Sequence, residues 1–195
     1  MRRVALLSAA LVLLSACGGT DSSATPTTTA VHVFSPWTED GSKNTVPVKG
    51  ESSGQCIGQS SKVTGTGVYR CLVGASIQDP CFAPPNQKNP AKLACAPDPW
   101  SGITLMTLAG KLPAGDDDAE DIPNEPHWAI ELENGDRCSS VGGTAGSSGG
   151  VTMPYLCKSG SSASDTSKDT QPWTTQYNKN RISFDLVPLK VASAW

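Results

Sequence analysis

The sequence contains few histidines and no closely spaced pair of cysteines. His32 and His127 are its two histidines, and consecutive cysteines are never fewer than ten residues apart. Zinc sites in small folds use cysteine pairs only a few residues apart, so this spacing argues against a zinc site. Basic residues do not cluster either, and the formal net charge of −3 at pH 7 argues against a nucleic-acid partner. We therefore expect no metal and no cofactor.

Long apolar runs and helical periodicity are also missing. The apolar-rich stretch 4–14 makes about 16 Å of helix, roughly half of the ~30 Å that a hydrocarbon core requires. No other stretch repeats apolar residues at helical spacing, and the 15 prolines would interrupt a helix. Internal repeats are absent as well, which argues against a solenoid or a propeller.

The first residues have the order of an export signal, with Arg2 and Arg3 before the apolar stretch and small residues after it. Leu14-Ser15-Ala16-Cys17 resembles the lipobox of bacterial lipoproteins. The resemblance implies that residues 1–16 are a signal peptide and that the Cys17 thiol is diacylglycerated, with fatty acids such as palmitate. An ordinary secretory signal with a chance cysteine is one alternative. Export by the twin-arginine route is another, although the arginine pair lacks the flanking residues of that motif.

Lipidation of Cys17 predicts a chain anchored at the extracytoplasmic face of the cell membrane. More than one acyl chain is needed for stable anchoring, and a diacylglycerol meets that need. Residues 17–30 are then the lipidated cysteine and a flexible tether of Ser, Thr, Pro and Gly. Removing residues 1–16, which hold two arginines, changes the net charge from −3 to −5.

The six cysteines beyond Cys17 predict disulfides, because an even count in an exported chain matches an oxidising compartment. Six cysteines allow 15 connectivities, and the sequence alone does not choose among them. We favour pairing between neighbours, which closes short loops and contributes about 3 kcal/mol for each bond. The favoured pairs are Cys56–Cys71, Cys81–Cys95 and Cys138–Cys157.

Strand and turn signals dominate from residue 55 onward. The runs 68–74 and 103–108 are rich in β-branched and aromatic residues, and 151–157 is a strand candidate that Pro154 restricts to an edge or a bulge. The clearest signal is Asn134-Gly135 between two alternating runs, which predicts a hairpin with a type I′ turn. Its face toward the core consists of Trp128, Ile130 and Leu132.

A second hairpin is expected around residues 178–180, with Ile182, Phe184 and Leu186 alternating along its second strand. Together the signals predict an all-β fold. We expect a single small disulfide-stapled sandwich or barrel-like domain over residues 55–195, with long Pro/Gly-rich loops at 79–90 and 94–102. Residues 31–54 are ambiguous and mostly loop-like, although 31–34 has the composition of an edge strand.

Three patterns have features of catalytic or metal sites. Residues 146–150 fit Gly-x-Ser-x-Gly and faintly resemble the chymotrypsin-like Gly-Asp-Ser-Gly-Gly, but no histidine follows position 127, and a flexible Gly/Ser loop is the simpler interpretation. The acidic run 116–121 lacks the alternation of calcium loops and predicts a solvated loop. Paired carboxylates near Trp100 would suit a small hydrolase, with Asp79, Asp98 and Asp136 as the candidates.

The five tryptophans are expected mainly to fill the core, and Trp100 in its polar, proline-bounded segment is the best candidate for exposure. We name Trp100, Asp98 and Asp79 as weak candidate ligand contacts. Arg70 is expected to pair with a carboxylate such as Asp79 rather than to bind an anion.

Several short motifs of residues 55–195 together resemble a group of secreted or lipid-anchored actinobacterial proteins of unassigned function. The more specific of them are "DPCF" at 79–82 and "NGDRC" at 134–138. The resemblance implies an exported, disulfide-bonded domain and no catalytic residues. The sequence thus predicts a non-enzymatic binding or interaction module of the cell envelope, whose partner is an envelope protein, a polymer or a small molecule. The alternative is a small envelope hydrolase with paired carboxylates.

Overall fold

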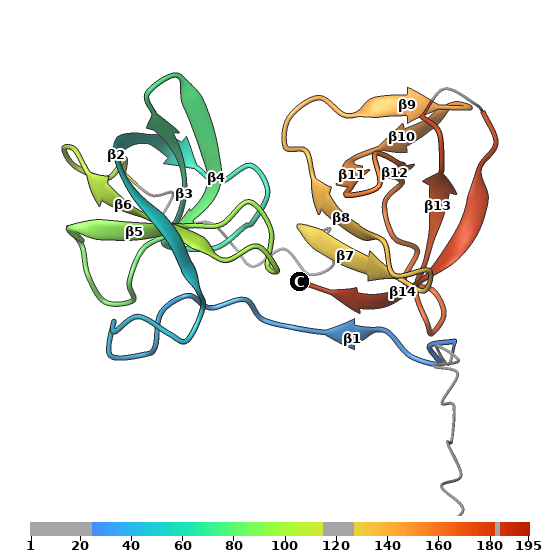
Figure 1. Cartoon of the computed structure of the whole chain (residues 1–195), viewed down its shortest axis with the longest axis horizontal. Helices are drawn as coiled ribbons and strands as arrows, with labels where there is room; N and C mark the ends of the chain where they lie inside the picture. The colour runs from blue at the N-terminus through green and yellow to red at the C-terminus, as the bar shows by residue number, and fades with distance from the viewer. Residues whose placement is uncertain (1–24, 115–126, 182–183) are drawn as a thin grey trace, which may run out of the picture.

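The computed structural model describes residues 25–114, 127–181 and 184–195, and in these residues all regular structure is β-strand. The strands form two closed sheets that lie side by side, with the C-terminus between them (Figure 1). Within the described residues, no helix has the length and apolar character needed to cross a membrane. We call the two sheets the first and the second barrel.

The first barrel is a meander in which each strand pairs antiparallel with the next, and its first and last strands close it in parallel. Gly54 lets the first strand cross the barrel closely, because a Cβ there would overlap the carbonyl oxygen of Leu72. The strands are β2 (Val48–Gln59), β3 (Val68–Val73), β4 (Ser76–Phe82), β5 (Lys92–Cys95) and β6 (Ile103–Leu108).

The second barrel is antiparallel throughout, and pairing of its last strand with its first closes it. Its strands are β7 (Ala129–Leu132), β8 (Arg137–Ser140), β11 (Tyr155–Cys157), β12 (Ser162–Ala163), β13 (Thr174–Asn178) and β14 (Val187–Ala194). A hairpin of β9 (Gly146–Ser148) and β10 (Val151–Met153) extends from it.

Residues 29–31 bind to the second barrel, and the chain then crosses to the first barrel (Figure 1). The short strand β1 (Ala30–Val31) pairs in parallel with β14. Just before it, the buried Thr29 hydroxyl donates to the carbonyl of Val191 at 2.7 Å and accepts from the amide of Trp173 at 2.8 Å. Three hydrogen bonds hold this residue, because its own amide donates to Gln171 Oε1 at 2.9 Å.

Three apolar clusters form the core, one inside each barrel and one between them. Leu93 and Met106 are fully buried in the first barrel, and Ile130 and Val191 in the second. The cluster between the barrels joins residues of both, with buried members Ala94, Ala96, Ile103, Trp128 and Ala129. This shared cluster unites the barrels into one packed body.

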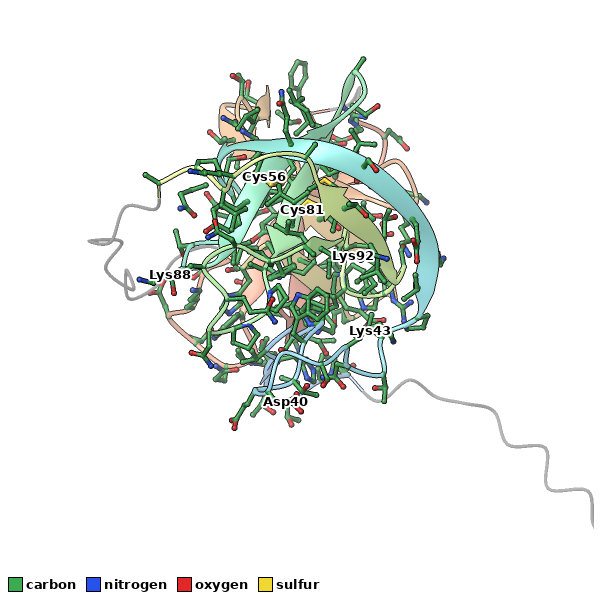
Figure 2. The ribbon with its side chains drawn as sticks, turned by 90° about the vertical axis from the view of Figure 1, so that its left-hand side faces the viewer. Asp40, Lys43, Cys56, Cys81, Lys88 and Lys92 are labelled. Atoms are coloured by element: carbon green, nitrogen blue, oxygen red, sulfur yellow. A yellow bond between two sulfur atoms is a disulfide. The ribbon has the colours of Figure 1, made fainter. Side chains whose placement is uncertain are left out.

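The three disulfides join neighbouring cysteines, as predicted: Cys56–Cys71, Cys81–Cys95 and Cys138–Cys157. In each pair the two cysteines are direct partners on adjacent antiparallel strands. Each disulfide therefore links two neighbouring strands of one barrel covalently. Figure 2 looks onto the first barrel, where Cys56 and Cys81 lie near the centre of the view.

The predicted all-β, disulfide-stapled class is confirmed; the expectation was a sandwich or barrel-like domain, and the strands form two closed sheets. The all-β signals do not encode this division, because it depends on which distant strands close each ring. In the ambiguous region 31–54, β2 begins at Val48 and β1 reaches only Val31. The expected loops at 79–90 and 94–102 are shorter than predicted, because β4 extends to Phe82 and β5 to Cys95.

The hairpin at 128–141 forms, with Trp128, Ile130 and Leu132 all buried. Its turn is not type I′, because that turn requires positive φ at both central residues and only Gly135 has it, at 80°. The Gly135 amide instead donates to the Leu132 carbonyl. The Leu132 amide donates to the Asp136 carbonyl, and this bond is the first between the two strands. This is a three-residue loop with glycine in the left-handed position.

Two other strand predictions needed adjustment. Pro154 separates β10 from β11, as its missing amide predicts. The C-terminal hairpin forms from β13 and β14, but β14 begins at Val187, so the predicted strand positions Phe184 and Leu186 lie outside it. Phe184 is 79 % exposed, so its side chain does not belong to the core.

Candidate functional site

A groove of about 710 Å³ lies at the end of the first barrel and extends toward the cluster between the barrels. We call it the aromatic groove. Four aromatic side chains line it, namely Phe34, Trp37, Tyr69 and Phe82. The rest of the lining consists of three prolines, a polar rim and two small residues: Pro36, Pro84 and Pro85, then Ser35, Thr66, Asn86, Gln87 and Lys88, and finally Gly67 and Ala83. Its volume lies within the range of roughly 300–1,000 Å³ that is usual for small-molecule sites.

Distant parts of the chain bring these aromatic rings together. Phe34 and Trp37 lie in the crossing segment between β1 and β2, whereas Tyr69 and Phe82 belong to β3 and β4. The Trp37 indole Nε1 donates to the carbonyl of Phe82 at 2.9 Å, which fixes the indole against the barrel. The Phe34 ring packs 5.4 Å from the Phe82 ring. The floor of the groove is therefore held rigidly.

A turn next to Trp37 fixes the direction of the crossing segment. The Asp40 carboxylate accepts hydrogen bonds from the hydroxyl of Thr38 at 2.5 Å and the amide of Ser42 at 2.9 Å. These bonds, the Thr38 bond foremost, lower the pKa of Asp40, which is fully exposed. Trp37 forms an isolated bridge with Lys43 across the turn. The segment thus enters the groove with a defined backbone.

Tyr69 provides a polar group within the aromatic lining. The residue as a whole is 8 % exposed, its hydroxyl is not among the fully buried polar atoms, and no described residue forms a hydrogen bond with that hydroxyl. Burial raises the pKa of this phenol, so it stays protonated and able to donate at neutral pH. An accessible hydroxyl without a partner among the described residues is free to exchange its water for a hydrogen bond to a ligand atom.

The charge of the lining is low. Lys88 is its one ionisable side chain apart from Tyr69, and Figure 2 shows Lys88 on a loop at the edge of the barrel. The rim amides of Asn86 and Gln87 both donate and accept hydrogen bonds. Flat aromatic faces with amide and hydroxyl groups around them suit an uncharged ligand that has apolar faces and hydroxyl edges.

Trp100, the predicted exposed aromatic residue, instead packs between the barrels. It is partly buried in the shared cluster and lies edge-on to Trp195, with ring centroids 4.9 Å apart. The Arg137 guanidinium is 5.4 Å from its ring centroid, and the Lys158 ammonium is 5.6 Å away. Of the five tryptophans, Trp128 and Trp173 are buried in the core, as expected, and the other three pack partly buried against the shared cluster.

The two other weak ligand candidates hold local turns. The Asp98 carboxylate accepts from the amides of Trp100 and Ser101 and from the Ser101 hydroxyl, at 2.6 to 2.9 Å. The Asp79 carboxylate accepts from the Ser60 hydroxyl and from both the amide and the hydroxyl of Ser61. Their oxygens stabilise backbone turns, a common structural role for aspartate.

The predicted pairing of Arg70 with Asp79 is wrong. No ion pair joins them, because the serine hydroxyls and the Ser61 amide already bind both Asp79 oxygens.

The carboxylate-pair alternative gains no support from three cavities that described residues line. Asp79 is the single carboxylate in their linings. The Asp136 carboxylate binds Ser159 and Tyr177 instead, with the Tyr177 hydroxyl at 2.9 Å. It also lies near Cys138 and Cys157, but their sulfurs are bonded to each other and offer no thiolate to a metal.

The Gly/Ser segment forms the β9–β10 hairpin, as its simpler interpretation predicts. Ser148 is buried, and its hydroxyl accepts from Asn178 Nδ2 at 2.6 Å. The cavity beside it has no histidine in its lining, and His127 instead packs 5.1 Å from the Trp173 ring. Cys17 and the acidic run 116–121 lie outside the described residues.

Sequence reasoning missed the aromatic groove. One signal was available, namely the dense aromatic and proline content of 34–37 and 82–85, but nothing in the sequence indicates that these segments meet. No known protein family, curated protein or solved structure matches the chain.

Proposed function

We propose that this protein is a lipid-anchored, non-catalytic binding module at the extracytoplasmic face of the cell membrane, and that the aromatic groove binds an uncharged carbohydrate chain of the envelope. The observation that carries the proposal is a groove of about 710 Å³ lined by aromatic rings, in which the Tyr69 hydroxyl has no hydrogen-bond partner among the described residues. The three disulfides support an oxidising compartment outside the cytoplasm.

The hydrogen bonds within the groove favour a carbohydrate over a proline-rich peptide as the ligand. Grooves for proline-rich peptides combine aromatic ridges with side-chain donors that bind peptide carbonyl groups. The indole of Trp37 does not serve in this way, because its N–H is bonded to Phe82. What remains are the Tyr69 hydroxyl and the rim amides of Asn86 and Gln87, which both donate and accept. Sugar hydroxyls can use both functions, whereas a run of prolines has no N–H and uses only the donors.

The proposal is tested by titrating the chain with cellohexaose, whose sugar rings have flat apolar faces, and with decaproline as the competing class. We expect tryptophan fluorescence to change with cellohexaose and not with decaproline, because Trp37 lies in the groove. Tyr69→Phe removes one hydroxyl and should weaken binding about five- to thirtyfold.

The matched control for Tyr69→Phe is Tyr177→Phe, which removes a buried hydroxyl of the second barrel. Its binding should equal that of the unmodified chain. Saturable binding of decaproline in the groove would contradict the carbohydrate assignment. Failure of both probes, with Tyr69→Phe indistinguishable from the unmodified chain across a wider panel of glycans, would contradict the site itself.

A further inference from the structure

A second cavity, of about 250 Å³, lies between the two barrels and away from the aromatic groove. The first barrel contributes Lys62, Arg70 and Asp79, and the second contributes Gly142 and Gly143 from the loop after β8. None of these residues lines the groove. We call this space the interbarrel cavity.

Arg70 enters this cavity with its charge unpaired. Its side chain is partly buried, and its Nε is fully buried with no hydrogen-bond partner among the described residues. Neither described ion pair includes Arg70. A buried N–H donor without a partner is costly, so the Arg70 Nε at the edge of a cavity indicates that the guanidinium lacks an acceptor there.

Asp79 is close to Arg70 but does not act as that acceptor. Both of its oxygens accept hydrogen bonds from Ser60 and Ser61, at 2.5 to 3.0 Å. Because these serines hold the carboxylate, the guanidinium donors remain available to a ligand. A planar guanidinium is suited to bind two oxygens of one oxyanion.

Lys62 adds a second positive charge at the same cavity. Burial lowers the pKa of its ammonium, and the nearby Asp79 carboxylate opposes that shift. Two cations and one carboxylate leave the cavity with a net charge of +1. This charge complements an oxyanion with one negative charge, such as a phosphodiester, better than a dianionic phosphate monoester.

We propose that the interbarrel cavity binds a phosphodiester group, with the Arg70 guanidinium and the Lys62 ammonium as its two charged donors. The group belongs either to a phospholipid head or to a soluble phosphodiester, and the two sources share this chemistry. The site is independent of the aromatic groove, and its occupation bridges the two barrels.

The test uses the whole chain from residue 17 onward, with Cys17→Ser to keep it in solution, and dimethyl phosphate as the probe. Titration followed by amide NMR should shift the signals of Ser61, Gly142 and Gly143, which line the cavity. Arg70→Gln should weaken binding about tenfold or more, and Lys62→Gln several-fold.

Lys92→Gln is the matched control, because Lys92 forms an exposed ion pair with Glu51 on the outside of the first barrel. It should bind the probe as the unmodified chain does. A second titration with phosphatidylglycerol vesicles separates the sources. If the chain binds the vesicles and Arg70→Gln abolishes this binding, the ligand is a lipid head group. If the chain binds dimethyl phosphate but not the vesicles, the ligand is a soluble diester.

The proposal is overturned if dimethyl phosphate shifts amides elsewhere, or if Arg70→Gln and Lys62→Gln leave its affinity unchanged. If Arg70→Gln does not fold, the proposal is still tested by two results: which amide signals dimethyl phosphate shifts in the unmodified chain, and how Lys62→Gln changes the affinity. The groove titrations with cellohexaose are unaffected by either result, so the two proposals fail separately.

Discussion

A Cβ atom at Gly142 would lie 2.9 Å from the hydroxyl oxygen of Ser61. The loop after β8 thus approaches the turn after β2 so closely that it leaves no space for a side chain. Gly142 also has a φ of +63°, a conformation that glycine adopts without strain. This contact joins the two barrels at the interbarrel cavity.

We expect Gly142→Ala to destabilise the protein by about 2–4 kcal/mol, the sum of backbone strain and the steric conflict with Ser61. The matched control is Gly143→Ala, because Gly143 has a φ of +78° but open space around its Cβ position. It should cost only about 1–2 kcal/mol. Urea denaturation measures both losses, and equal losses would show that the Ser61 contact does not matter.

Each barrel should depend on its own disulfides. Replacing Cys138 and Cys157 together by alanine is expected to lower the free energy of unfolding by about 3 kcal/mol, because a short closed loop is released in the unfolded chain. The pair Cys56 and Cys71 closes a loop of similar length and should cost a similar amount. Denaturant titration of the two double variants checks this. A loss below about 1 kcal/mol in both would contradict a stapling role.

His127 should make stability depend on pH. Burial, and then the nearby Lys168, lower the pKa of its imidazole in the folded protein. The unfolded chain, with a pKa of about 6.5, therefore takes up a proton that the folded chain does not. Stability should fall as the pH drops below about 6.5 and stay constant above it.

Thermal melts of His127→Gln between pH 7 and pH 5 test this expectation, and the variant should show a weaker dependence on pH. His32→Gln is the control, since His32 is exposed and stacks on Trp195 with ring centroids 4.9 Å apart. An unchanged slope for His127→Gln, or an equal change in both variants, would assign the dependence to other groups.

Lipidation of Cys17 is tested by labelling living cells with an alkyne-bearing palmitate analogue. The chain should incorporate the label and fractionate with the membrane, because its cysteine becomes diacylated. Cys17→Ser should lose both the label and the membrane association while keeping its three disulfides. An unlabelled chain, or one with free thiols in the cytosol, would contradict the anchoring prediction.

Local signals predicted local structure well. The Asn134-Gly135 pair correctly located a hairpin, although the actual loop has three residues and not two. The neighbour pairing of cysteines was correct because sequential antiparallel strands bring them into register. By contrast β2 was missed, since its sequence is rich in glycine and serine and gives no alternating apolar pattern.

The sites depended on contacts that no local pattern contains. Phe34 and Tyr69 meet in the groove because the N-terminal segment crosses from the second barrel to the first. The expected pairing of Arg70 with a carboxylate such as Asp79 does not form, because hydrogen bonds from Ser60 and Ser61 compete for that carboxylate. Which donor binds a carboxylate depends on the tertiary structure, and the sequence alone does not show it.

The fastening of Thr29 to the second barrel has a mechanical consequence. If the chain is held by an acyl group at Cys17, a pulling force on it travels along residues 18–28 and meets the hydrogen bonds of Thr29 to Gln171, Val191 and Trp173. The second barrel bears the tension there, before it reaches the crossing segment that carries Phe34 and Trp37. The groove can therefore keep its shape while the envelope around it is strained.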